Sequence, residues 1–179
     1  MKKITCAIAA ATALFSQAAF ANTCHSFPGI TQCTTGRVES IHSSGSVTLN
    51  GTTVLKGTLV NGVINAEDSK FSGLEVNGSA KLAQCTINHN AIIRGLLKAF
   101  NTRFQKELTV YSDKIFLTNS LVKRNLHIVE GKKAPVVHLN ESSKIEGNVI
   151  FDAKNPGVVF IAGGSVVSGK IINGEIVKQ

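Results

Sequence analysis

The chain has 179 residues, of which 43% are hydrophobic, 17% charged and 6% aromatic, and its formal net charge is +8. This length indicates one domain of ordinary size. The hydrophobic content excludes a chain that is disordered throughout, and the small share of charged residues excludes a long coiled coil.

The start of the chain, residues 1–21, has the parts of a secretory signal peptide. Lys2 and Lys3 precede an apolar run over residues 4–15, and an Ala-x-Ala sequence ends at Ala21, the expected cleavage site. The run is too short for a membrane-spanning helix, which needs about 20 residues. The sequence therefore predicts a secreted protein in the periplasm or outside the cell, with no transmembrane segment in the mature chain. An uncleaved N-terminal anchor is the alternative.

Three cysteines remain after removal of this segment, in a compartment that permits disulfides. Cys24 and Cys33 bracket a short loop with Pro28 and Gly29, so we expect them to pair. Cys85 is left over and is interpreted as a small buried apolar residue, with an intermolecular bridge or a reactive thiol as the alternative. No Cys-x-x-Cys motif is present, and we therefore expect neither a metal site nor a cofactor.

From Ser44 onward, short segments with apolar residues at alternate positions are separated by turns rich in Gly, Asn and Ser. Alternation with a period of two is typical of β-strands, and the β-branched residues that prevail here favour strands as well. Such segments cover residues 45–51, 73–78, 107–112, 125–131, 135–140, 147–152, 157–164 and 169–174.

The spacing of these segments favours one all-β architecture. Their starts lie 10–12 residues apart at Leu126, Val137, Val149, Val159 and Ile171, which fits a sandwich, a barrel or a solenoid. Many single asparagines in the turns and a core set of Val, Ile and Leu favour the solenoid, since Asn tolerates left-handed backbone and can stack. The Asn-Gly pairs at 50–51, 61–62, 77–78 and 173–174 are also strong hairpin signals, so hairpins remain the alternative.

Four stretches, residues 45–51, 73–79, 143–149 and 163–171, resemble the coils of secreted parallel β-helix proteins. They are also faintly similar to bactofilins, the polymer-forming β-helical scaffolds, although this chain departs from them in having a secretory signal. The resemblance covers about residues 44–177 and implies a single-domain parallel β-helix, or β-solenoid. We expect this domain over residues 44–179, after a short disulfide-stapled N-terminal cap at residues 22–43.

Residues 91–108 break the strand pattern. Apolar residues recur there at helical steps, with basic residues mostly elsewhere on the wheel, which predicts a basic amphipathic helix that docks to a membrane surface or a partner. The alternative is two further solenoid strands whose large side chains fill a corner. The apolar set is Ile92, Ile93, Leu96, Leu97, Phe100, Phe104 and Leu108.

No catalytic motif is complete. Glu67 and Asp68 are the only adjacent acidic pair, and a small carbohydrate-active β-helix enzyme would need them grouped with a basic residue in one groove. His127 and His138 fit a two-histidine metal site one rung apart, but we interpret them as exposed strand histidines. We therefore assign no catalytic residue and lean towards a protein that is not an enzyme.

Basic residues predict either a binding surface or simply a solubilising one. On one side of a stacked fold they would form a positive stripe that attracts anionic polymers, such as lipopolysaccharide or another anionic glycan, or an acidic envelope protein. Nucleic acid is not expected, given the compartment, the absence of Trp and the single Tyr. The candidate residues are Arg94, Lys98, Arg103, Lys106, Lys123, Arg124, Lys132 and Lys133.

The last apolar segment, with Ile171, Ile172, Ile176 and Val177, has no polar cap after it. Solenoids need capped ends, so we expect a homo-oligomer or a partner to cover it. The preferred function is a non-enzymatic structural or binding protein of the bacterial envelope or medium, self-associating or binding an anionic glycan or a partner protein. An accessory component of a secretion or envelope machine, docking through residues 91–108, is another alternative.

Overall fold

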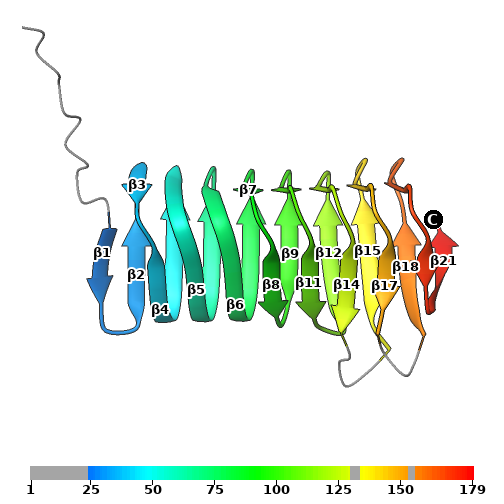
Figure 1. Ribbon diagram of the computed structural model, residues 1–179, viewed down its shortest axis with the longest axis horizontal. Coiled ribbons are helices and arrows are strands. Elements are labelled where there is room, and N and C mark those ends of the chain that lie inside the picture. The colour runs from blue at the N-terminus through cyan, green and yellow to red at the C-terminus, as the bar shows by residue number, and fades with distance from the viewer. Residues whose placement is uncertain (1–23, 130–133, 153–155) are drawn as a thin grey trace, which may run out of the picture.

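The computed structural model describes residues 24–129, 134–152 and 156–179. The chain winds into one parallel β-solenoid of about 8 turns, drawn from β1 to β21 along the long axis in Figure 1. A single 21-stranded sheet holds all the strands, and the described residues contain no helix. The predicted all-β solenoid is therefore confirmed. The expected signal peptide lies outside the described residues.

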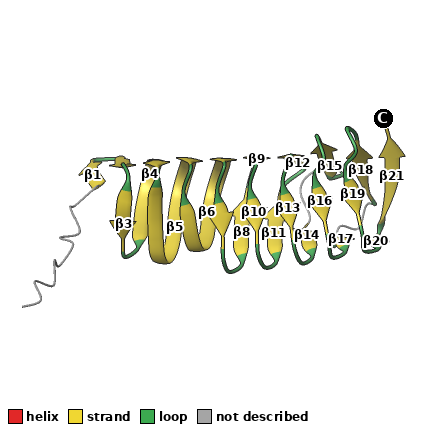
Figure 2. Cartoon of the chain, turned by 90° about the horizontal axis from the view of Figure 1, so that it is seen from above, coloured by secondary structure: helices red, strands yellow, loops and turns green. Residues whose placement is uncertain are grey.

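Each turn of the solenoid, here called a coil, has three faces that follow one another along the chain as A, B and C (Figure 2). Face A consists of β2 (Ile30–Cys33), the last parts of β4 (Ile41–Asn50), β5 (Thr52–Glu67) and β6 (Lys70–Ala83), then β9 (Leu97–Phe100), β12 (Lys114–Thr118), β15 (Val136–Asn140), β18 (Gly157–Ile161) and β21 (Gly174–Lys178).

Faces B and C are built in the same way. Face B consists of β3 (Gly36–Val38), the starts of β5 and β6, β7 (Thr86–Ile87), β10 (Arg103–Phe104), β13 (Leu121–Val122), β16 (Lys144–Ile145) and β19 (Val166–Val167). Face C consists of the start of β4, the middle parts of β5 and β6, then β8 (Ala91–Arg94), β11 (Leu108–Tyr111), β14 (Leu126–Val129), β17 (Val149–Phe151) and β20 (Ile171–Ile172).

Equivalent residues of successive coils lie directly over one another. The inward position of face A passes through Val47, Ile64, Ala80, Leu97, Ile115, Val137 and Val159. A coil is therefore 16–18 residues long as far as Ile115 and 22 residues long from there to Val159. The steps of 10–12 residues seen in the sequence are half-coils, which start alternately on faces C and A.

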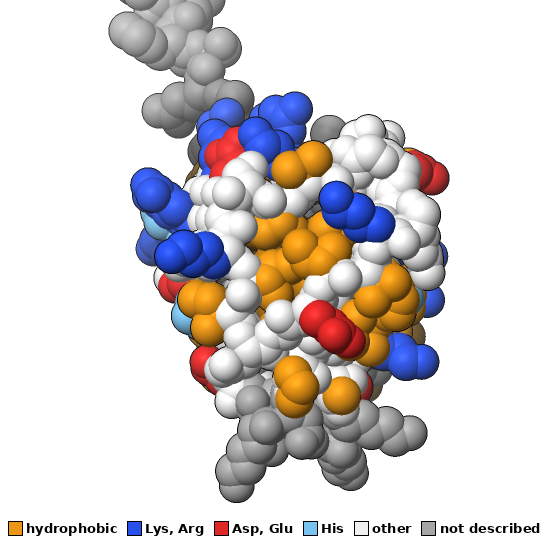
Figure 3. Space-filling model, turned by 90° about the vertical axis from the view of Figure 1, so that its right-hand side faces the viewer, with side chains coloured by type: hydrophobic (Ala, Val, Ile, Leu, Met, Phe, Trp, Pro, Cys, Tyr) orange, Lys and Arg blue, Asp and Glu red, His pale blue; other side chains and the backbone are white. Residues whose placement is uncertain are grey.

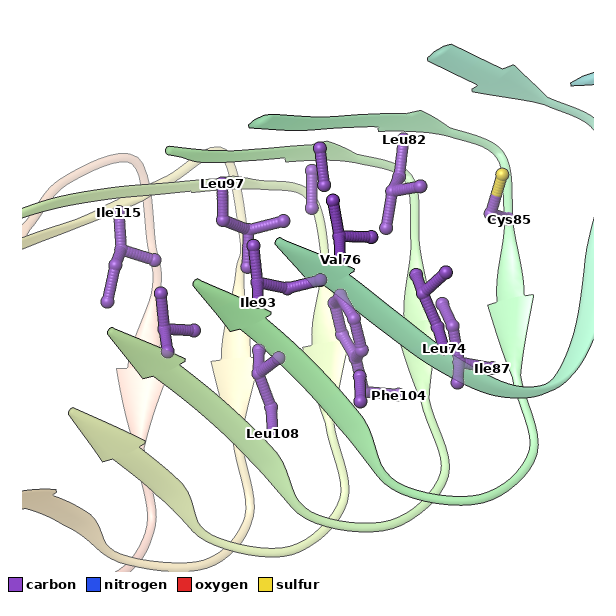
Figure 4. Close-up of a cluster of buried hydrophobic side chains, with 14 of the residues drawn as sticks. Leu74, Val76, Leu82, Cys85, Ile87, Ile93, Leu97, Phe104, Leu108 and Ile115 are labelled. Atoms are coloured by element: carbon purple, nitrogen blue, oxygen red, sulfur yellow. The ribbon is translucent and has the colours of Figure 1, made fainter. Parts of the chain in front are cut away.

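The interior is a narrow column of aliphatic side chains with a few phenylalanines. Figure 4 shows inward side chains from several coils meeting there, among them Leu74, Ile93 and Phe104. Burial of one such side chain stabilises the fold by about 1.5–3 kcal/mol. Because a coil can bury its inward face only against its neighbours, the stability of each coil depends on the coils that flank it.

Residues 91–108 form the strands β8, β9 and β10 and the first residue of β11 (Leu108–Tyr111), so the helical interpretation is wrong. The alternative of further solenoid strands is correct, although three strands are present rather than two and Phe100 is 45% exposed. The turns between these strands are tight, and inward residues on either side of a turn are four apart, as are Ile93 and Leu97 or Phe104 and Leu108. Residues four apart also lie on one face of an α-helix, which is why the sequence pattern resembles an amphipathic helix. Since these four side chains are fully buried, the segment is part of the core and is not a detachable docking element.

Stacked glycines form the corner between faces C and A. Gly62 and Gly78 both have φ of +148°, and a Cβ on Gly78 would lie 1.9 Å from the carbonyl oxygen of Gly62. Only glycine combines this backbone with so close an approach. The Asn-Gly pairs at 61–62 and 77–78 therefore mark corners of parallel coils, and their interpretation as hairpins is wrong.

The corner between faces A and B carries a buried ladder of hydroxyl groups. Backbone N–H groups of Thr102, Ser120 and Ser143 donate to the hydroxyl of the next coil at 3.1, 3.2 and 3.1 Å. These bonds satisfy backbone donors that would otherwise be buried without a partner. The inward members are Thr52, Ser69, Thr102, Ser120, Ser143 and Ser165, with Cys85 in place of a hydroxyl between Ser69 and Thr102.

A disulfide closes the N-terminal part of the fold. Strand β1 (Cys24–Phe27) pairs antiparallel with β2, and the predicted Cys24–Cys33 bond is confirmed with an S–S distance of 1.99 Å. Strand β2 already pairs in parallel with β4. The antiparallel β1 thus ends the sheet on face A.

The glycine corner gives a direct prediction. Gly78→Ala should lower the free energy of unfolding by about 2 kcal/mol or more, because the Cβ meets backbone and the φ is unfavourable. Gly57→Ala is the matched control, since a Cβ there meets nothing within 4 Å and its φ is ordinary. Urea midpoints measure both, and equal midpoints for the two variants would contradict the packing described.

Candidate functional site

Face B presents one column of outward side chains along the solenoid, here called the cation column. Basic residues occupy alternate coils in it and no acidic residue is present. Its members, in register, are Arg37, Thr53, Lys70, Thr86, Arg103, Leu121, Lys144 and Val166. Neighbouring strands lie about 4.8 Å apart, so successive basic residues are about 10 Å apart.

The shortness of the face B strands explains why this column is so regular. Strands β7, β10, β13 and β16 have two residues each, and the second residue of each is fully buried in the core. The first residue must then point outward, because successive side chains of a strand alternate between faces. Each coil therefore places one side chain at this position.

The charges of the column are largely unbalanced. Lys144 forms an exposed ion pair with Glu146 at 3.2 Å, whereas Arg37, Lys70 and Arg103 form no ion pair with a carboxylate of the described residues. An exposed pair contributes only about 0–1 kcal/mol. Lys144 can therefore exchange Glu146 for the anionic group of a ligand at little cost.

A recess of about 450 Å³ lies between two of these basic residues. It is lined by Asn101, Arg103, Asn119, Ser120, Leu121, Ser142 and Lys144. Asn101, Asn119 and Ser142 have left-handed backbone at the corner between faces A and B, and the Asn119 amide donates to the Asn101 side-chain oxygen. Two cations beside amide and hydroxyl groups suit an anionic group that also carries hydroxyls, as in an acidic sugar.

The other basic residues singled out in the sequence do not gather on this face. Arg94 ends β8 on face C, where it pairs with Glu75 and its guanidinium carbon lies 5.3 Å from the Tyr111 ring centroid. Lys98 lies on face A. Lys106, Lys123 and Arg124 follow β10 and β13 at the corner between faces B and C. Lys132 and Lys133 lie outside the described residues.

Three members of the column, Arg37, Lys70 and Lys144, are not among the basic residues that the sequence singles out. They lie 33 or more residues apart in the chain, and only the coil register brings them into line. The unequal coil lengths hide that register, because no fixed period connects the three positions.

The two histidines considered for a metal site lie on different faces. His138 is on face A, stacked between Phe116 and Phe160 with ring centroids 4.8 and 5.3 Å away. His127 is on face C, with its Nε2 atom 3.1 Å from a Glu107 oxygen. The described residues contain no group of three or more His, Cys, Asp or Glu side chains that could hold a metal ion.

Of the acidic pair Glu67 and Asp68, only Glu67 lines a depression of the surface. Glu67 lines a depression of about 220 Å³ on face A together with Lys81 and Asn65. Asp68 has left-handed backbone at the next corner and does not line that depression. The grouping of both carboxylates with a basic residue, which an enzyme would need, is therefore not formed.

The residues expected at an assembly surface lie in the last coil. Ile171 and Ile172 form β20, and Ile176 and Val177 belong to β21. Ile172 and Ile176 are 39% and 48% exposed. Figure 3 shows apolar side chains in the middle of this end of the solenoid, and no strand of the described residues pairs with its outer edges.

Comparisons with protein-family models, curated proteins and solved structures give no match. In residues 24–129, 134–152 and 156–179 there is no helix of the length and apolarity needed to cross a membrane.

The free thiol of Cys85 is buried, as predicted, and it takes the place of a hydroxyl in the corner ladder. It donates to the Ala83 carbonyl oxygen at 3.2 Å. Loss of solvation raises the pKa of this thiol from 9.0 to about 11, although the backbone N–H of Ser69 opposes the shift. The thiol is therefore protonated at neutral pH and is not a nucleophile in the folded protein.

Cys85 should accordingly stay unlabelled in the folded protein. At pH 8 a water-soluble thiol reagent should react about a hundredfold more slowly with the folded than with the urea-unfolded chain, because the thiolate fraction follows the pKa. Since the folded pKa is the higher one, wild type should lose stability relative to Cys85→Ser as the pH rises from 9.0 to about 11. Labelling at the unfolded rate would show that Cys85 is accessible.

Proposed function

We propose that this chain is a secreted, non-enzymatic binding protein of the bacterial envelope or medium, and that the cation column binds an extended acidic glycan. The proposal rests on one observation: basic residues on alternate coils of face B, in a column without acidic residues. The signal peptide that the sequence predicts and the Cys24–Cys33 disulfide, which is compatible with an oxidising compartment, support the location.

The spacing of the column favours a particular charge pattern in the ligand. Two coils span about 10 Å, and an extended chain of β-linked sugars advances by a similar distance over one disaccharide. A glycan with one acidic sugar in each disaccharide can therefore place a carboxylate beside each of Arg37, Lys70, Arg103 and Lys144. The neutral sugars would then lie over Thr53 and Thr86, whose hydroxyls can hydrogen-bond them.

Binding of this kind is electrostatic and takes place at exposed side chains, so the affinity should depend on salt. Counterions leave the polymer when the basic side chains bind it, and exposed charges are screened at high ionic strength. The recess between Arg103 and Lys144 adds directed hydrogen bonds from Asn101 and Asn119 at one point of the column. It gives the glycan a fixed position along the face.

A variant set tests the column. Lys70→Gln, Arg103→Gln and Lys144→Gln combined should weaken binding of hyaluronate, a polymer with one carboxylate per disaccharide, by roughly tenfold or more at low salt. The control combines Lys114→Gln, Lys170→Gln and Lys178→Gln, which removes the same charge outside the column and should change affinity less than about twofold. Calorimetric titration of the full chain measures both.

The outcomes separate the proposal from general charge attraction. An equal loss in both variants would show that only net charge matters, and absence of binding to the wild type would refute the function. Polygalacturonate, with a carboxylate on every sugar, tests the spacing. If polygalacturonate binds more tightly than hyaluronate at equal salt, the proposed match between one disaccharide and two coils is wrong.

Self-association is a second candidate function, favoured by the exposed apolar residues Val166, Ile172 and Ile176 of the last described coil. Light scattering across concentration, at low and high salt, tests it. Assembly through apolar contacts should persist in high salt, whereas a constant monomer mass would exclude it.

A further inference from the structure

A second recess, on face A, is not explained by glycan binding to face B. It has a volume of about 270 Å³ and is lined by Lys81, Leu82, Ala83, Lys98, Ala99, Phe100, Phe116 and Thr118. Two outward columns border it, one with Lys81, Lys98 and Phe116 and the other with Ala83, Phe100 and Thr118. The small side chain of Ala83 leaves the space open between larger neighbours.

The two lysines at this recess lie directly opposite each other on adjacent strands. Like charges in this position repel and destabilise a sheet. No carboxylate of the described residues forms an ion pair with Lys81 or Lys98, although Glu67 lines the adjoining depression. The recess therefore has a local excess of positive charge that an anionic group placed between the lysines would balance.

An aromatic surface borders the same recess. Phe116 is the first of three stacked rings, with His138 and Phe160 behind it on the following coils. On its other side the column continues with Lys98, whose Nζ atom lies 5.8 Å from the Phe116 ring centroid. The Lys98 ammonium group thus lies over this face of Phe116, and no aromatic ring of the described residues stacks there. Phe100 is 45% exposed at the opposite border.

We propose that this recess binds a planar aromatic carboxylate of one or two rings. The ring lies over Ala83 against Phe116 and Phe100, and the carboxylate is held between the ammonium groups of Lys81 and Lys98. Offset or edge contacts between aromatic rings add to the burial of apolar surface, and lysine ammonium groups form charge-assisted hydrogen bonds with carboxylate. An uncharged aromatic ring would not use the two lysines, and an aliphatic acid would not use the aromatic contacts with Phe116 and Phe100.

The test uses 2-naphthoate as the probe, titrated into the full chain by calorimetry or ligand-observed NMR. Two probes each lack one feature: 2-naphthalenemethanol has no charge, and decanoate has no ring. We expect 2-naphthoate to bind at least about tenfold more tightly than either. Equal affinity for decanoate or for the alcohol would overturn the proposed chemistry, and so would absence of saturable binding by 2-naphthoate.

Two substitutions on one strand locate the site. Ala83→Leu fills the recess without changing charge and should weaken 2-naphthoate binding by about tenfold or more. Ser79→Leu, an outward position of β6 that does not line the recess, is the control and should leave the affinity unchanged. Equal affinity in both variants, with unchanged thermal unfolding, would place the ligand elsewhere and overturn the proposal.

Loss of charge provides an independent readout, since Lys98→Gln should weaken 2-naphthoate binding and leave the binding of the neutral alcohol unchanged. The Lys70, Arg103 and Lys144 triple variant should bind 2-naphthoate as wild type does. The two proposals concern different faces, and each can therefore fail without the other.

Discussion

Direct stacking of equivalent residues, one coil over the next at about 4.8 Å, is the constraint on which the rest of this structure depends. Each residue must therefore be compatible with the residues at the equivalent position of the coils before and after it. Aliphatic side chains meet this requirement inside the fold, as from Leu97 to Ile115. At the corners it is met by hydroxyls that bond to the next coil, as in Ser120 and Ser143, and by glycines that let backbones touch, as in Gly62 and Gly78.

The same constraint organises the outer surface. Charged side chains stacked on adjacent coils repel each other, and on face B this repulsion is reduced by placing Thr86 or Leu121 between the basic residues. The result is an evenly spaced row of cations, of which Lys144 alone pairs with a carboxylate of the described residues. Lys81 and Lys98 on face A are an exception, because they are direct neighbours without such a spacer. A surface built from columns thus presents two distinct arrangements of cationic side chains on one solenoid, spaced on face B and adjacent on face A.

The class of fold could be predicted from the sequence because alternation of apolar residues and turn residues is local information. The helical interpretation of residues 91–108 failed because that spacing arose across turns, where two strands meet at an angle. The Asn-Gly pairs were ambiguous for a similar reason, since a glycine with positive φ serves a hairpin and a coil corner equally well. In both cases the conformation depends on which residue of the neighbouring coil the segment pairs with, and the local sequence does not contain that information.

The candidate site was less accessible to sequence reasoning. Arg103 could be singled out from its local surroundings, but Arg37, Lys70 and Lys144 belong with it only through register across coils of unequal length. Charge counts alone also grouped Arg94 with this set, although its side chain is already engaged by Glu75 on another face. The sequence lists the basic residues, but only the coil register shows which of them share a column.

Whether an acidic glycan lies along face B with its acidic groups two coils apart can be seen in a crystal structure of the chain with a hyaluronate oligosaccharide. We expect successive carboxylates beside Lys70, Arg103 and Lys144, with the sugar chain parallel to the solenoid axis. A sugar chain that crosses the face, or that binds on face A or C, would refute the proposed binding mode.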